Sequence, residues 1–270
     1  MSGTPDSTSA EVAVECWTAG HTERKTDRVA NEVPIALVYH GVPHVVMLAT
    51  PADLEDYAVG FTVSEGLVAS PAEIQSVEVV PGSDAIEVRI GIAAERFSEL
   101  LQRRRNLTGR TGCGLCGTET LEQAMRPISA VRQRAAVPVE DLHGALVQLE
   151  SLQPLNARTG SVHAAAWAIP GRGIQIVRED VGRHNALDKS IGALLRSNTD
   201  VTAGYMIITS RASYEMVQKA ATVGIAFIAA VSAPTALAIR IAEKSGVTLV
   251  GFARRDRHVV YTRSPCTPTT

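Results

Sequence analysis

The sequence has few aromatic residues, few cysteines and no long apolar run. Of its 270 residues, 4% are aromatic and four are cysteines. The longest apolar run, Val223 to Val231, contains Gly224 and is far shorter than the ~20 residues that span a membrane. No secretory signal is recognisable, and the four cysteines lack the spacing of a disulfide framework. We therefore expect a cytoplasmic protein that does not enter a membrane.

An excess of charge of either sign is also missing. The sequence has 26 Lys and Arg residues against 28 Asp and Glu residues, which gives a formal net charge of −2. This balance gives no electrostatic reason to expect binding to nucleic acid. The apolar and charged fractions, 45% and 20%, are those of a folded globular protein.

Changes in composition along the chain divide it into five predicted segments. The first residues are rich in Ser, Thr and Ala without any periodicity, which indicates a flexible leader. The predicted segments are the leader (1–30), a small α+β domain (31–110), a cysteine-containing loop and linker (111–135), an α/β domain (136–262) and a tail (263–270).

Segment 31–110 has the alternation of a small α+β domain. Apolar stretches predict strands at 35–39, 44–48, 77–80 and 86–90. Thr50 and Pro51 predict the start of a helix, with Thr50 as the N-cap and Pro51 at the first helical position. A second helix is expected at 93–105, because its basic end suits the negative end of the helix dipole.

Segment 136–262 contains more helices, and they alternate with short apolar strands. Helices are predicted at 138–152, 184–195, 213–222 and 235–245, and strands at 162–169, 173–177, 205–209, 226–231, 248–252 and 259–261. Short apolar strands separated by helices favour a parallel sheet covered on both faces. The opening hairpin departs from a plain Rossmann order, and the element order matches a cytidine-deaminase-like three-layer α/β domain.

The most informative stretch is a Cys-x-x-Cys pair, Cys113 and Cys116. Glycines at positions 109, 112, 114 and 117 disfavour a helix or a strand interior, so we expect both thiols on a mobile surface loop. A zinc site would need a second such pair, which the sequence lacks. A thioredoxin-like redox pair would follow a strand and start a helix. A sulfur carrier is the third interpretation, since Arg105 and Arg110 favour the reactive thiolate, and two unmodified thiols are the plainest alternative.

Three polar clusters, at 179–185, 210–215 and 232–235, fall where predicted strands end and helices begin. Ligands of open α/β sheets bind at that edge, and helix N-termini there favour anions such as phosphates. Arg183 and Arg211 could pair with phosphate oxygens, although serines at such positions are common as ordinary helix caps. A further basic turn follows the next predicted strand.

A zinc deaminase can be compared with this pattern. Its zinc ligands are a His or Cys at the start of one helix and two cysteines at the start of the next. The matching positions here hold His184, Ser210, Arg211 and Ser213, and His163 is followed by alanines instead of the expected glutamate. We therefore expect a deaminase-like fold without zinc chemistry and without a metal site.

Five motifs together resemble the FdhD family over about residues 33–262. They are 110–117 (RTGCGLCG), 160–166 (GSVHAAA), 179–189 (EDVGRHNALDK), 210–215 (SRASYE) and 231–235 (VSAPT). The resemblance implies a sulfur carrier required for formate dehydrogenase activity. A cysteine desulfurase would load a persulfide onto Cys113, and Cys116 would assist. The sulfur would then pass to the molybdenum cofactor in its bis-guanine-dinucleotide form.

The resemblance also implies where that cofactor binds. The family's cofactor-binding stretch maps onto Phe252, Ala253, Arg254, Arg255, Asp256 and Arg257. Together with the polar clusters, the further candidates are Gly182, Arg183, His184, Asn185, Ser210, Arg211, Ser213, Tyr214 and His163. Guanine nucleotides would act as partial mimics, and the family implies a homodimer. Two alternatives stay open, namely a cofactor-binding chaperone without sulfur transfer and a thiol-disulfide oxidoreductase.

Overall fold

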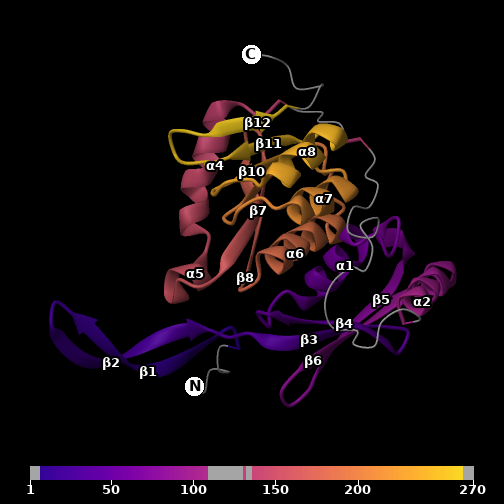
Figure 1. The fold of residues 1–270 in the computed structure, drawn as a ribbon, viewed down its shortest axis with the longest axis horizontal. Coiled ribbons are helices and arrows are strands. Elements are labelled where there is room, and N and C mark those ends of the chain that lie inside the picture. Colours follow the sequence, from indigo (N-terminus) through magenta and orange to yellow (C-terminus); the bar gives the residue numbers. More distant parts are fainter. Residues whose placement is uncertain (1–6, 109–129, 132–135, 264–270) are drawn as a thin grey trace.

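A computed structural model shows three sheets, of two, four and six strands, that follow one another along the chain (Figure 1). The structure describes residues 7–108, 130–131 and 136–263. The mixed α/β class expected from the sequence is confirmed. The cytidine-deaminase-like layering and the division into domains stay predictions.

The first sheet is a long hairpin that projects from the rest of the molecule (Figure 1), with strands β1 (Ser9–Thr18) and β2 (His21–Ala30). Its ladder runs from Ser9 opposite Ala30 to Thr18 opposite His21. The sequence-based expectation of a flexible leader over 1–30 is therefore wrong for this hairpin. The period of a strand is present, because the half-buried Val12 and Val14 alternate with the exposed Glu11, Ala13 and Glu15, but the polar composition masks it. Trp17, near the tip, is 75% exposed.

The second sheet has the strand order β4-β3-β6-β5 and shares one apolar core with two helices. Its core includes Ile35, Leu37 and Ile90 from the strands, with Tyr57 and Phe61 from the first helix. The elements are β3 (Val33–Tyr39), β4 (Val42–Ala49), α1 (Leu54–Ser64), the 3-10 helix η1 (Pro71–Glu73), β5 (Ile74–Pro81), β6 (Ile86–Ile92) and α2 (Ala94–Thr108).

Helix α1 begins later than the sequence predicts. The N-cap is Asp53, in the left-handed conformation with φ 53°, and not Thr50. Thr50 is fully buried, and its hydroxyl accepts a hydrogen bond from the backbone N–H of Val181 at 3.2 Å. A tertiary contact thus uses the hydroxyl group that the local pattern assigns to a helix cap.

The third sheet has the order β12-β11-β10-β9-β7-β8. Strands β9, β10 and β11 are parallel, as expected, whereas β7, β8 and β12 run antiparallel to their neighbours. The strands are β7 (His163–Ile169), β8 (Gly173–Asp180), β9 (Tyr205–Ile208), β10 (Phe227–Ala230), β11 (Thr248–Gly251) and β12 (Val259–Thr262).

Helices cover both faces of this sheet (Figure 1). Helix α4 packs on the face that presents Tyr205 and Phe227, and three helices pack on the face that presents Trp167, which is fully buried. The helices are α4 (Val139–Ser151), α5 (Pro154–Thr159), α6 (Arg183–Arg196), α7 (Tyr214–Thr222) and α8 (Ala236–Ser245). The short α5 was not predicted. Across the described ranges, every helix is too short or too polar to cross a bilayer.

Helices α1 and α6 connect the two larger sheets through a very close contact. A Cβ atom added at Gly60 would lie 1.7 Å from the carbonyl oxygen of Asp188, and one at Gly192 would lie 1.8 Å from that of Asp56. Only glycine, which lacks a Cβ, allows two helices to approach this closely. The close contact therefore fixes the second sheet against the third.

Candidate functional site

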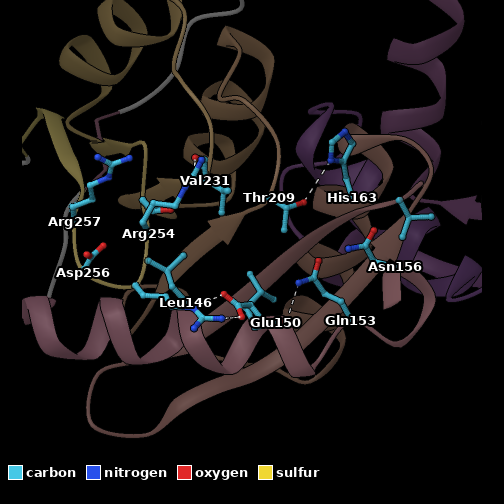
Figure 2. A pocket seen from close by; sticks show the side chains of 14 residues that line it. Leu146, Glu150, Gln153, Asn156, His163, Thr209, Val231, Arg254, Asp256 and Arg257 are labelled. Atoms are coloured by element: carbon cyan, nitrogen blue, oxygen red, sulfur yellow. Dashed lines mark hydrogen bonds and ion pairs between the residues drawn. The ribbon is translucent and has the colours of Figure 1, made fainter. Parts of the chain in front are cut away.

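A cavity of about 820 Å³ opens at the carboxyl edge of the parallel strands (Figure 2). Thr209, Val231 and Ala253 line it; Thr209 and Val231 follow directly after β9 and β10, and Ala253 lies two residues after the end of β11. This edge is where open α/β sheets bind their ligands. The cavity is of the size that holds a small molecule or a cofactor fragment, typically ~300–1,000 Å³.

Two walls with different chemistry enclose the cavity (Figure 2). One wall is the basic turn after β11, which provides Arg254, Arg255, Asp256 and Arg257. The other wall comes from α4 and from the starts of α5 and β7. It consists of Leu146, Leu149, Glu150, Gln153, Asn156, Val162 and His163. The cavity therefore combines apolar side chains, such as Leu146, Leu149 and Val162, with polar and cationic ones.

The basic turn, Arg254–Arg257, is held in place by its own backbone and by one ion pair. The N–H of Arg254 donates to the carbonyl of Arg257 at 2.8 Å, and its guanidinium donates to the carbonyls of Ala253 and Val231. Arg255 binds Glu150 of α4 through two nitrogens. The hydrogen bonds from Arg255 lower the pKa of the Glu150 carboxyl. Glu150 is therefore ionised and neutralises Arg255.

Arg257 and Asp256 remain available to a ligand. Neither side chain forms an ion pair or a side-chain hydrogen bond with the described residues, and both are exposed at the cavity. Since Glu150 neutralises Arg255, the guanidinium groups of Arg254 and Arg257 outnumber the single carboxylate of Asp256, and this wall keeps a net positive charge. A phosphate group would find two guanidinium groups here, and the free carboxylate could accept N–H groups of a ligand.

His163 lies at the far side of the cavity, at the start of β7. Its Nδ1 is 3.5 Å from the hydroxyl oxygen of Thr209, which also accepts a hydrogen bond from the N–H of Ala164 at 2.9 Å. Burial, and to a smaller degree the positive charge of Arg183, lower the pKa of His163. The imidazole is therefore neutral at pH 7 and can donate or accept one hydrogen bond without adding charge.

Several predicted site residues lie at the same edge of the sheet but do not line the cavity. They are Gly182, Arg183, His184, Asn185, Ser210, Arg211, Ser213, Tyr214 and Phe252. His184 Nε2 lies 2.7 Å from Glu215, and this hydrogen bond lowers the pKa of Glu215 to about 2. Arg211 is exposed, and the hydroxyl of Ser210 donates to the carbonyl of Arg211 at 3.1 Å.

The string Glu179–Lys189 mainly joins parts of the fold. Asp180 is fully buried and accepts hydrogen bonds from the backbone N–H groups of Thr50 (3.0 Å) and Gly182 (2.7 Å). It also forms an ion pair with Lys189 at 2.6 Å, and Lys189 donates to the carbonyl of Thr50 at 2.9 Å. Asn185 donates to Asp180 and to the carbonyl of Leu48. We call Asp180, Asn185, Lys189 and Thr50 the buried polar cluster.

The structure also adds cavity residues that sequence reasoning missed. Thr209 could have been found, because it directly precedes the predicted cluster at Ser210. Glu150, Gln153 and Asn156 carry no local signal. Gln153 donates to the carbonyl of Leu149, and the backbone of Asn156 donates to Glu179, so both positions are set by the junction of α4 and α5.

Cys113 and Cys116 lie outside the described residues, so their placement relative to the cavity stays a prediction. Among the residues that the structure describes, no group of three or more His, Cys, Asp or Glu side chains could hold a metal ion. The absence of zinc is still an expectation to be measured. From the described side chains, the cavity is suited to bind an anionic, partly apolar small molecule.

Comparisons with known proteins show which proteins the chain is similar to. The model of the FdhD/NarQ family matches residues 30–266. A sulfur carrier protein FdhD of Cupriavidus necator is 52% identical over 94% of this chain and 88% of its own length. One from Bordetella petrii is 49% identical over 88% of this chain and 85% of its own length.

A solved structure provides a separate comparison at the level of the fold. A formate dehydrogenase accessory protein from Desulfotalea psychrophila covers 97% of this chain and 100% of its own, with a TM-score of 0.77 and 23% identity. At that identity the likeness concerns the fold alone. The family model and the close relatives place the chain in a family, and it belongs to the FdhD/NarQ family.

Proposed function

We propose that the chain is a cytoplasmic sulfur carrier for formate dehydrogenase. It accepts persulfide sulfur from a cysteine desulfurase on Cys113 and transfers it to the molybdenum cofactor in its bis-guanine-dinucleotide form. Support comes from family membership, since close relatives are named sulfur carrier proteins. The observation that carries the proposal is the cavity lined by the basic turn Arg254–Arg257.

The cofactor, as the substrate of the transfer, would enter the cavity with one of its guanine nucleotide ends. Arg254 and Arg257 would bind the phosphates, because guanidinium groups match phosphate oxygens in a two-pronged geometry. The neutral His163, Asn156 and Gln153 on the opposite wall would supply uncharged hydrogen bonds. The volume of about 820 Å³ is enough for a nucleotide end.

Sulfur transfer would use both cysteines of the pair. The thiolate of Cys116 attacks the inner sulfur of the Cys113 persulfide, a Cys113–Cys116 disulfide forms, and the outer sulfur leaves as hydrosulfide for the cofactor. A cellular dithiol reductant then reduces the disulfide and restores both thiols. Arg105 and Arg110 in the sequence favour the thiolate form that both loading and release require.

Intact mass spectrometry tests the carrier role. After incubation with a cysteine desulfurase and cysteine, the chain should gain one sulfur atom that a thiol reductant removes. Cys113→Ala should prevent the gain and abolish maturation of formate dehydrogenase, and Cys116→Ala should still load sulfur but deliver it poorly. Sulfur loading by Cys113→Ala would contradict the role of that residue. Maturation without sulfur loading in the unaltered chain would instead indicate a cofactor chaperone.

Calorimetry with guanosine diphosphate tests the binding site separately. The unaltered chain should bind guanosine diphosphate more tightly than adenosine diphosphate, and sulfur loading on Cys113 should not depend on the cavity. If neither nucleotide binds while sulfur loading proceeds, the cofactor site lies elsewhere and the carrier role stands.

A further inference from the structure

The connection between β11 and β12, residues 252–258, carries the basic turn, and two side-chain contacts hold it on helix α4 (Figure 1). In the first contact, Arg255 binds Glu150. In the second, Nε2 of His143 lies 3.0 Å from Nδ1 of His258, and neither histidine lines the cavity. His143 and Glu150 are seven residues apart, so they lie on the same face of the helix. The connection is therefore fastened to one face of α4 at two points.

The two contacts differ in their exposure to solvent. The side chains of Arg255 and Glu150 are 65% and 53% exposed, and an exposed ion pair contributes little to stability. Both histidines are half-buried, and their rings meet edge to face with centroids 5.2 Å apart. A hydrogen bond between half-buried groups costs more to break, because each group would then lack a partner. The histidine pair therefore contributes more than the ion pair to holding the connection on α4.

The hydrogen bond between the two imidazoles depends on how many protons they carry. It needs one ring nitrogen with a proton and one with a free lone pair. Two neutral rings meet this condition, and so does a pair with one additional proton, because an imidazolium can donate to a neutral ring. When both rings are protonated, both facing nitrogens are donors and two positive charges lie side by side. The second additional proton therefore breaks the contact.

The surroundings of His258 keep that second proton away at pH 7. Burial, followed by the positive charges of His143 and Arg263, lowers the pKa of His258 below its ordinary 6.5. Arg263 follows β12 directly, so it acts on His258 from another element than His143 does. No carboxylate among the described residues offsets these effects. The other charged groups close to the pair in sequence are Glu140, Asp141, Asp256 and Arg257.

We propose that the His143–His258 pair is a pH-sensitive latch, which holds the basic turn on α4 at neutral pH and releases it when both imidazoles are protonated. After release, only the exposed ion pair between Arg255 and Glu150 ties the connection to α4. The cavity wall that carries Arg254 and Arg257 then loses its fixed position. The proposal concerns the fold around the cavity, and it does not depend on the sulfur-carrier function or on the ligand.

Hydrogen–deuterium exchange of the full chain, followed by mass spectrometry, tests the latch without any ligand. In the closed turn the backbone N–H of Arg254 donates to the carbonyl of Arg257. After correction for the intrinsic pH dependence of exchange, residues 252–258 should exchange roughly two- to tenfold faster at about pH 5 than at about pH 7, the effect of losing one hydrogen bond. Strand β9, in the middle of the sheet, should keep its protection at both pH values.

Two substitutions of His143 separate the hydrogen bond from the charge. His143→Phe keeps a ring of similar shape but cannot form the hydrogen bond, so residues 252–258 should exchange fast at both pH values. His143→Gln keeps an acceptor that His258 can use in either protonation state, and it carries no charge. Its residues 252–258 should therefore be protected equally at both pH values. The exposed His21→Gln, in the hairpin, is the matched control and should behave like the unaltered chain.

Three results would overturn the proposal. The first is faster exchange at low pH that appears in β9 to the same extent as in residues 252–258, because the change would then be global unfolding. The second is normal protection of residues 252–258 in His143→Phe at neutral pH, or no change in the unaltered chain on acidification. The third is a rise in exchange on acidification that is as large in His143→Gln as in the unaltered chain.

Discussion

The buried polar cluster and the basic turn Arg254–Arg257 are both rich in charge, but they use it in opposite ways. Asp180 and Lys189 are fully buried, and their polar atoms are bound to one another and to Thr50. In the basic turn, Arg257 and Asp256 are exposed and remain unpaired within the described chain. Groups that the fold already satisfies hold the structure together, and groups that it leaves unsatisfied are available to a ligand.

Removing the buried ion pair should produce the largest change. Lys189→Met leaves Asp180 as a buried, uncompensated carboxylate, which typically costs about 3–5 kcal/mol in the free energy of unfolding. Denaturant unfolding measures the loss. The exposed Lys244→Met should stay within about 0.5 kcal/mol of the unaltered chain. Equal stability of the two variants would mean that the buried polar cluster does not support the fold.

The helix contact beneath that cluster should be almost as sensitive. Gly60→Ala would place a Cβ 1.7 Å from the carbonyl oxygen of Asp188, so α1 and α6 must move apart. Overpacking of this kind costs about 1–3 kcal/mol or more, measured as a loss of unfolding free energy.

Gly144 on the exposed face of α4 provides the control for that substitution. A Cβ there would meet no atom within 4 Å. Gly144→Ala should raise the unfolding free energy by about 0.5–1 kcal/mol, because alanine is the better helix former. The prediction fails if both alanine variants change stability in the same direction.

Arg257, whose side chain has no partner among the described residues, should affect binding and not stability. Arg257→Ala should weaken guanosine diphosphate binding about ten- to a hundredfold, the effect of losing one charge-assisted contact, and Arg254→Ala should act on the same scale. Calorimetry at two salt concentrations measures this, and the effect should shrink at high salt. Arg211→Ala, exposed but outside the cavity, should change affinity less than about twofold. Equal losses of affinity in the Arg211 and Arg257 variants would indicate that the nucleotide binds nearer to the starts of α6 and α7.

The smallest expected effect concerns the pH dependence of stability. Burial lowers the pKa of His163 below its ordinary 6.5, so the unfolded chain binds a proton at a higher pH than the folded chain. Stability therefore falls as the pH drops below about 6.5 toward the lowered pKa of His163. Thermal unfolding at several pH values should show a weaker fall for His163→Gln than for the unaltered chain. The exposed His21→Gln serves as the control and should follow the unaltered profile.

Sequence patterns predicted the parallel strands and most helices because those signals are local. Short apolar strands such as Phe227–Ala230 can be recognised from their composition, and the amphipathic α4 can be recognised from its helical period. The start of α1 was misplaced, because the cap signal at Thr50 is outweighed by a contact with residues 130 positions later in the chain. The hairpin was missed, because the few apolar residues of its alternation, Val12 and Val14, are outnumbered by polar ones.

The candidate site was predicted only in part, for a related reason. The basic turn follows a strand end and can be read from the sequence, and His163 is the first residue of β7, which runs antiparallel to β9. The polar cluster 179–185 was also predicted to bind a ligand, although Asp180 and Asn185 are bound within the fold. Nothing in a local pattern tells whether a polar side chain will meet a ligand or another part of its own chain.

The positions of the two tryptophans give this protein a pair of natural optical probes. Trp167 is fully buried in the six-stranded sheet, whereas Trp17 is 75% exposed near the tip of the hairpin. A collisional quencher such as iodide should therefore reach Trp17 and leave the emission of Trp167 intact. Quenching would report on changes in the exposure of Trp17 in the hairpin. A red shift of the unquenched emission would report that the six-stranded sheet opens around Trp167. One unlabelled sample would thus report both regions independently.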